Sequence, residues 1–180
     1  MGYEAMGLSD YPEDKIALNL LLEQERVPPM DFVVNCAGYK RDEDENNWAP
    51  EKCIGEHYRN LCAVVFASEE KMRGDLKYIQ NQLLGKLMGR AREEFDEAVH
   101  IGFMSRQGRH RSIALCRLTI EILKRKGFNV DKEPMHHSMV AWEKYQCSTC
   151  EECRTSFERK TNLYDIAVSV WDSLTLESLI

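Results

Sequence analysis

Residues 98–127, AVHIGFMSRQGRHRSIALCRLTIEILKRKG, decide the fold. The first seven residues form a run apolar enough for a strand covered on both faces. Apolar residues then recur at helical spacing, at Ile113, Cys116, Ile120 and Leu123. Gly127 follows as a residue that can end this helix. The stretch therefore predicts a strand, a loop and a helix, in that order.

The loop between this strand and this helix, SRQGRHRS at 105–112, is cationic in a chain whose formal net charge is −6. A loop before a helix N-terminus offers backbone N–H groups and the positive end of the helix dipole, and both attract phosphate. Gly108 permits a tight backbone path, and Arg111 can close the ring as a bidentate fork. The predicted phosphate site consists of Ser105, Arg106, Gly108, Arg109, His110, Arg111 and Ser112.

The segments on either side predict the rest of an α/β domain. Residues 30–36, MDFVVNC, predict a short buried strand, and 128–138, FNVDKEPMHHS, predict a return to the sheet. A strand, a crossover helix and a second strand make a parallel unit. We therefore expect an α/β fold, a small and mainly parallel sheet with helices on both faces. The phosphate loop would lie between a central strand and a helix.

Three further segments have helical patterns. Residues 13–27 predict a helix that Pro28 and Pro29 stop, and residues 51–67 predict another. Ser68 can cap a long helix whose apolar stripe is Met72, Leu76, Ile79, Leu83, Leu87 and Ala91. In 162–180 the helical stripe is Leu163, Ile166, Val170 and Leu174, although Ile166, Val168 and Val170 also alternate as in a strand. The length of this last segment favours the helix.

The composition is that of a globular protein, with 43% hydrophobic and 30% charged residues over 180 positions. The apolar runs are too short to span a bilayer, and we expect no membrane partner. The N-terminus shows no secretory signal, and the seven cysteines then indicate reduced thiols in an intracellular, cytoplasmic protein. The acidic balance gives no global attraction to nucleic acid, so any such binding rests on a local basic patch.

The spacing of Ser105 and Arg111, with five residues between them and a serine after the arginine, matches the phosphate loop of protein tyrosine phosphatases. In those enzymes a cysteine occupies the position of Ser105. A serine hydroxyl stays protonated without a dedicated base, so Ser105 would bind a phosphate and not attack it. Non-catalytic binding is therefore the leading function. A phosphatase-like enzyme or a degenerate phosphatase is the alternative.

The motif GRHRSIAL after an apolar strand resembles the C-terminal domain of the RNase adapter protein RapZ family. MDFVVNC and NVDKEPMHHS resemble an earlier and a later strand of that domain, so the resemblance covers roughly 31–138. It implies a compact α/β domain that binds a phosphorylated small molecule or nucleotide, with RNA as a further candidate ligand. His110 and Arg111 would contact the ligand phosphate, and Gly108 would shape the loop.

Three parts of the chain follow from these patterns: an N-terminal arm and helix at 1–30, a RapZ-like α/β domain at 31–146, and a cysteine-rich segment with the C-terminal helix at 147–180. Cys147, Cys150 and Cys153 have a spacing that can supply three zinc ligands, with His137 as a fourth. Cysteines at this spacing also share one helix face, where they can pack as small apolar residues. Zinc is thus the one candidate cofactor. A zinc-stabilised interaction module is a further alternative function.

Overall fold

The computed structural model describes residues 30–39, 57–90, 98–105, 110–130 and 151–177. The elements in these ranges are β1 (Phe32–Asn35), α2 (Tyr58–Val65), α3 (Glu69–Arg90), β2 (Ile101–Met104), α4 (Arg111–Arg125), α5 (Glu151–Thr155) and α6 (Phe157–Glu177). The fold is α/β, as the sequence predicts. The expected helix at 13–27 lies outside the described residues. Of the expected return to the sheet at 128–138, only 128–130 are described, and they form no strand. Within the described ranges, no helix is long and apolar enough to cross a membrane.

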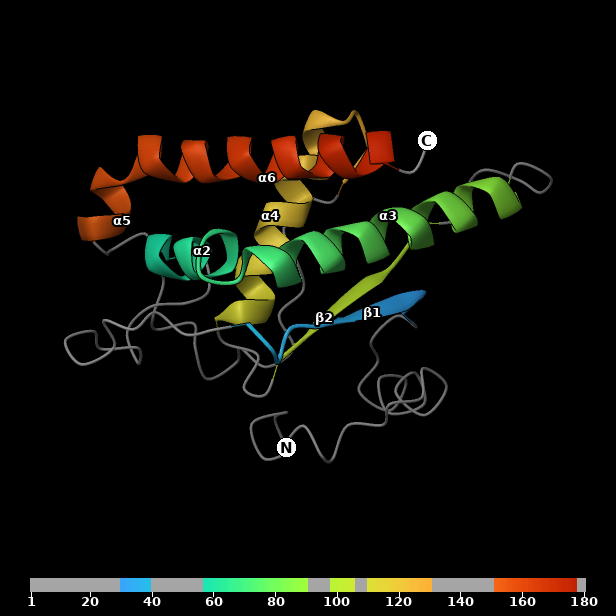
Figure 1. The fold of residues 1–180 in the computed structure, drawn as a ribbon, viewed down its shortest axis with the longest axis horizontal. Helices are drawn as coiled ribbons and strands as arrows, with labels where there is room; N and C mark the ends of the chain where they lie inside the picture. Colours follow the sequence, from blue (N-terminus) through green and yellow to red (C-terminus); the bar gives the residue numbers. More distant parts are fainter. Residues whose placement is uncertain (1–29, 40–56, 91–97, 106–109, 131–150, 178–180) are drawn as a thin grey trace.

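The two strands pair in parallel, with Phe32 opposite Ile101 and Val34 opposite Phe103. The side chains of Phe32 and Val34 are buried and point to the side on which the helices lie. Figure 1 shows the described helices gathered on that one side of the strands. The prediction of helices on both faces of the sheet is therefore confirmed for one face only. β2 is half-buried along its length, not fully covered as we expected, because it pairs with β1 alone among the described residues.

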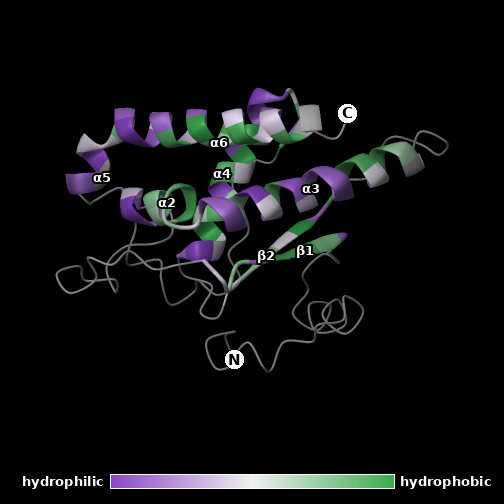
Figure 2. Ribbon diagram, viewed as in Figure 1, coloured by the Kyte–Doolittle hydropathy of each residue, from purple (hydrophilic) through white to green (hydrophobic). Residues whose placement is uncertain are grey.

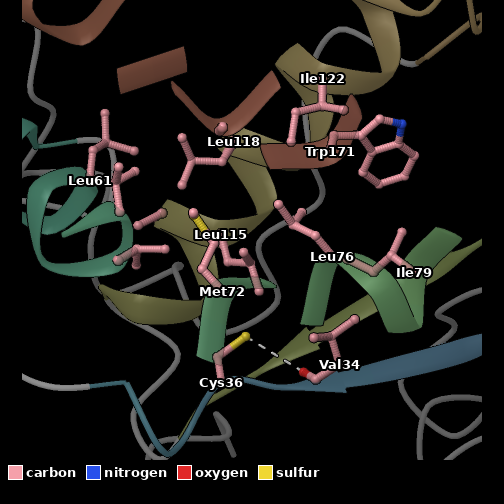
Figure 3. Close-up of a cluster of buried hydrophobic side chains, with 14 of the residues drawn as sticks. Val34, Cys36, Leu61, Met72, Leu76, Ile79, Leu115, Leu118, Ile122 and Trp171 are labelled. Atoms are coloured by element: carbon pink, nitrogen blue, oxygen red, sulfur yellow. Dashed lines mark hydrogen bonds between the residues drawn. The ribbon is translucent and has the colours of Figure 1, made fainter. Parts of the chain in front are cut away.

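The core lies between the strands and three helices, and α6 packs on the outside of α2, α3 and α4 (Figure 1). Figure 3 shows how the core side chains converge from these elements. Its fully buried members include Val34, Leu61, Met72, Leu76, Ile79, Leu115, Leu118 and Ile122. Figure 2 shows that these helices carry both hydrophobic and hydrophilic residues, and the hydrophobic residues named above are the buried ones. Apolar burial against neighbouring elements therefore stabilises the α-helices here more than their own propensity does.

The predicted stripe of α3 is confirmed over its first four members, which are buried: Met72, Leu76, Ile79 and Leu83. Leu87 is 44% exposed, so its predicted place in the core is wrong. The C-terminal part of α3 extends beyond the packed body (Figure 1), where the described elements offer Leu87 little to pack against. A periodic pattern shows which face is apolar, but it does not show how far the partner helix reaches.

The C-terminal segment is a helix, which confirms the choice made on length. Leu163 and Leu174 are buried as predicted, but Ile166 is 37% exposed. The other buried positions on this face are Ala167 and Trp171, one and two turns after Leu163. Because Trp171 is the largest of these side chains, the packed face of α6 is centred on it. Ile166 consequently lies at the margin of that face.

The end of α4 is a Schellman motif at Gly127. Gly127 has a φ of 83°, the left-handed conformation that glycine adopts readily. Its N–H donates to the carbonyl of Lys124, and the N–H of Phe128 donates to the carbonyl of Leu123, both at 3.0 Å. These two hydrogen bonds satisfy the last carbonyl groups of the helix, which have no partners within it.

Replacing Gly127 with Ala should lower the free energy of unfolding by about 1 kcal/mol, because a Cβ is disfavoured at this φ. Steric contact is not the cause, since an added Cβ would meet no atom within 4 Å. The matched control is Gly85→Ala in α3, where an added Cβ also meets no atom within 4 Å. That change should stabilise by about 0.5–1 kcal/mol, because the site is helical. Urea unfolding of both variants checks the opposite signs, and equal effects would contradict the account.

Candidate functional site

The predicted site lies where the carboxyl ends of both strands meet the N-terminus of α4 (Figure 1). The segment after β1 stays paired with β2, because the N–H of Cys36 donates to the carbonyl of Met104 at 2.6 Å. Ser105 directly follows β2, and Arg111 is the first residue of α4. In open α/β sheets, ligands bind in the crevice outside the carboxyl ends of the strands. The described ends of the expected loop, Ser105 and 110–112, therefore lie at a common kind of binding position.

Four of the predicted phosphate residues are described: Ser105, His110, Arg111 and Ser112. The other three, Arg106, Gly108 and Arg109, lie outside the described residues. His110 is the N-cap residue of α4, and its carbonyl accepts from the N–H of Ala114 at 2.8 Å. Its side chain makes no capping hydrogen bond. The imidazole is thus not committed to the N-terminal N–H groups of the helix.

A hydrogen bond between two serines closes the base of the loop. The Ser105 hydroxyl donates to the hydroxyl oxygen of Ser112 at 3.0 Å, and both residues are buried. The two ends of the loop are therefore held together, with RQGRHR between them. Ser105 makes this contact with another serine, which is not a base that could activate it.

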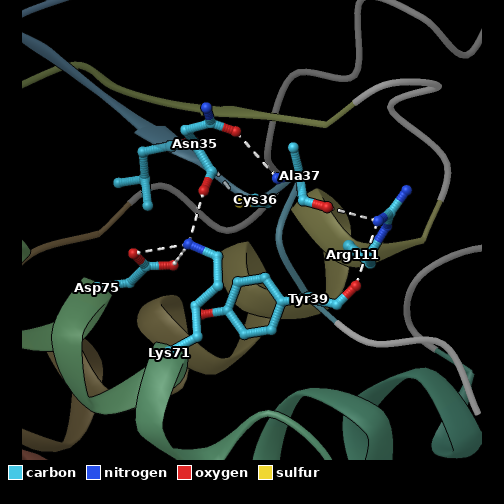
Figure 4. Close-up of polar contacts among 8 residues, drawn as sticks. Asn35, Cys36, Ala37, Tyr39, Lys71, Asp75 and Arg111 are labelled. Atoms are coloured by element: carbon cyan, nitrogen blue, oxygen red, sulfur yellow. Dashed lines mark hydrogen bonds and ion pairs between the residues drawn. The ribbon is translucent and has the colours of Figure 1, made fainter. Parts of the chain in front are cut away.

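Arg111 contacts the segment that follows β1. Its Nη1 donates to the carbonyl of Ala37 at 2.7 Å and to the carbonyl of Tyr39 at 3.2 Å (Figure 4). The arginine therefore connects the first turn of α4 to the end of the neighbouring strand. The prediction that Arg111 also forks a ligand phosphate stays a prediction.

Lys71, in α3, holds the same segment, a role that we did not predict from the sequence. Its Nζ donates to the carbonyl of Asn35 at 2.9 Å and lies 5.0 Å from the centre of the Tyr39 ring (Figure 4). The Nζ also pairs with Asp75, one turn later in α3, at 3.1 Å. Spacing of four residues between Lys71 and Asp75 is the only signal of this arrangement in the sequence.

The Cys36 thiol and the Tyr39 hydroxyl, at the two ends of this segment, are held in their neutral forms. Burial raises the pKa of the Cys36 thiol well above its usual range, and the nearby Asp75 carboxylate adds to the shift. Burial and Asp75 likewise raise the pKa of the Tyr39 hydroxyl. That hydroxyl has no hydrogen-bond partner of normal geometry among the described residues. The Cys36 thiol donates to the carbonyl of Val34 at 3.6 Å, and because Cys36 is fully buried it is a core group.

Stability should fall in alkaline solution, because both groups have a higher pKa in the folded than in the unfolded chain. The unfolded thiol ionises from about pH 8.5 and the unfolded phenol from about pH 10, so the loss begins near the first value and grows above the second. Urea unfolding between pH 7 and pH 10.5 measures it. Cys36→Ala should flatten the fall between about pH 8 and pH 9.5. An unchanged slope in that variant would contradict the assignment.

The structure describes only one of the four predicted zinc ligands. Cys153 falls within α5, while Cys147, Cys150 and His137 lie outside the described residues. The described residues contain no cluster of three potential metal ligands. α5 itself is held against the N-terminus of α2, because Glu152 accepts from the Arg59 Nε at 3.0 Å.

The two interpretations of these cysteines predict different metal contents. A zinc site would give a full equivalent of zinc in protein purified without chelator, and EDTA would lower the thermal stability. Elemental analysis with a melting curve in EDTA measures both. A zinc content near zero with no EDTA effect would contradict the zinc site and favour packing of the cysteines as apolar residues.

No family model, no curated protein and no solved structure matches this chain.

Proposed function

We propose that the chain binds a phosphorylated ligand, without chemical turnover, at loop 105–112. The observation that carries the proposal is the closed base of this loop, where Ser105 and Ser112 hold its ends together at the N-terminus of α4. The described ends of the loop therefore form a fixed frame beside the carboxyl ends of two parallel strands. Such a position suits an anion, because α-helix N-termini carry a partial positive charge.

The loop sequence supplies the charge that a phosphate requires. RQGRHR contains three arginines within six residues, in a chain with a net charge of −6. The attraction is thus local, and a compact anion fits it better than a long polyanion does. The expected ligand is a phosphorylated small molecule or a nucleotide, and RNA is a weaker candidate on the same chemistry.

A phosphatase activity would need a nucleophile at the start of the loop. Among the described residues, the Ser105 hydroxyl donates to Ser112, which is not a base. An unactivated hydroxyl does not displace a phosphate at a useful rate near neutral pH. Binding is therefore the function that the site supports better.

Calorimetric titration with inorganic phosphate tests the proposal. The wild-type chain should bind, and a variant with Arg106→Gln and Arg109→Gln should bind at least about tenfold more weakly, since each lost charged hydrogen bond costs about 1.5–3 kcal/mol. The matched control removes the same charge from exposed positions on two helices, with Lys77→Gln and Lys124→Gln. It should bind as the wild type does. Equal weakening in both variants would mean non-specific attraction and would contradict a built site.

Hydrolysis of an aryl phosphate separates binding from catalysis. The wild type should show none. Ser105→Cys introduces the thiol on which this loop chemistry depends, and activity in that variant alone would support the binding function. Turnover by the wild type that disappears in Arg111→Ala would replace the binding function with an enzymatic one.

A further inference from the structure

We infer that the segment Cys36–Tyr39, at the end of β1, forms the second wall of the phosphate site, and that Arg111 is a positioning residue that holds this wall. The inference rests on the proposed function. It differs from the predicted fork, in which Arg111 contacts the ligand phosphate directly. The two roles can be separated by experiment, because a residue that only holds the wall need not contact the ligand.

The first observation is that alternate carbonyl groups, from the last residue of β1 into this segment, accept from cationic side chains. The carbonyl of Asn35 accepts from Lys71, and those of Ala37 and Tyr39 accept from Arg111 (Figure 4). Lys71 belongs to α3 and Arg111 to α4, so two helices hold the segment. Hydrogen bonds from charged donors are roughly twice as strong as neutral ones, and the segment is accordingly well fixed.

The second observation concerns the chemistry of a strand end. Carbonyl oxygens carry a partial negative charge and would repel a phosphate placed beside them. Donation by Lys71 and Arg111 offsets that charge at the carbonyl groups of Asn35, Ala37 and Tyr39. The segment can then lie beside an anion at little electrostatic cost.

The third observation is the geometry of the Arg111 guanidinium. Nη1 carries two hydrogens, and it donates to two carbonyl oxygens, those of Ala37 and Tyr39. An end-on fork on a phosphate uses one hydrogen from each terminal nitrogen, and it would have to release one of these carbonyl groups. The contacts with the segment therefore compete with an end-on fork, whereas a side-on fork through Nε and Nη2 would leave both carbonyl groups in place. The contacts establish that Arg111 holds this segment.

A further hydrogen bond at the start of the segment involves neither Lys71 nor Arg111. The Asn35 Oδ1 accepts from the N–H of Ala37 at 2.9 Å, which shapes the turn just after the strand. Gly38 packs closely on Lys71, since an added Cβ would lie 3.2 Å from the Cδ and Cε of that lysine. Substituting Asn35 can therefore loosen the wall while both cations stay in the chain.

The test uses the full chain, inorganic phosphate as the probe, and the variant Asn35→Ala. Hydrogen exchange of the 37–39 amides should become faster, and phosphate affinity should fall about three- to tenfold, the usual effect of one lost hydrogen bond. The matched control is Asn81→Ala, which makes the same change at an exposed position of α3. It should alter neither quantity. Lys71→Met provides a second way to loosen the segment, with the donor to Asn35 removed.

Faster exchange at 37–39 with unchanged phosphate affinity, in either variant, would overturn the inference and return Arg111 to direct ligand contact. Weaker binding that accompanies the faster exchange would support the wall. A wild-type chain that binds no phosphate would instead contradict the proposed function itself. The two failures are therefore distinguishable.

Discussion

Replacing Leu76 with Ala should lower the free energy of unfolding by about 2–5 kcal/mol. Leu76 is fully buried in α3, at the place where this helix faces both α6 and the strands (Figure 3). The substitution removes buried apolar surface and leaves a cavity that the packed neighbours fill only in part. Urea unfolding followed by circular dichroism measures the loss.

Leu87→Ala is the matched control, because it makes the same substitution eleven residues later in the same helix. Leu87 is 44% exposed, so the expected loss is below about 1 kcal/mol. Equal losses for Leu76 and Leu87 would mean that the C-terminal part of α3 packs as tightly as its middle. That result would contradict the arrangement in which this part extends beyond the core.

Replacing Arg111 with Ala should weaken phosphate binding by about 1.5–3 kcal/mol, the usual scale for a hydrogen bond with a charged group. In this account the loss arises mainly because the carbonyl groups of Ala37 and Tyr39 lose their donor. The same change should lower the free energy of unfolding, because two charge-assisted hydrogen bonds between α4 and the end of β1 disappear. Calorimetry with inorganic phosphate and urea unfolding measure the two effects.

Arg125→Ala is the control for this change, since it removes the same side chain from the other end of α4. Arg125 pairs with Asp165 of α6 near the surface, and such pairs contribute at most about 1 kcal/mol. Phosphate affinity should not change in this variant. Unchanged phosphate affinity in Arg111→Ala would remove Arg111 from the site, in either of its two roles.

The parts of the fold that the sequence predicts are those encoded by neighbouring residues. The strand at 30–36, the unit of strand, loop and helix at 98–127 and the end of α4 at Gly127 all depend on periodicity or on one backbone conformation. Such signals are complete within a dozen residues. The structure agrees with them closely.

The remaining features depend on contacts between distant parts of the chain. Leu87 and Ile166 fit an apolar stripe, but their exposure depends on where the neighbouring elements end. Lys71 and Arg111 donate to backbone carbonyl groups, and every residue has such a group, so no sequence pattern marks the acceptor. No sequence pattern marks the hydrogen bond between Ser105 and Ser112 either, although the loop spacing places both residues in the predicted site.

The most direct test of the central claim is a titration of isotope-labelled protein with inorganic phosphate, followed through the backbone amide resonances. We expect saturable shifts centred on residues 105–112, with smaller shifts at 36–39, and none at the exposed C-terminal part of α3. Resonances that do not move, or shifts spread evenly over the basic surface, would contradict a phosphate site at this loop.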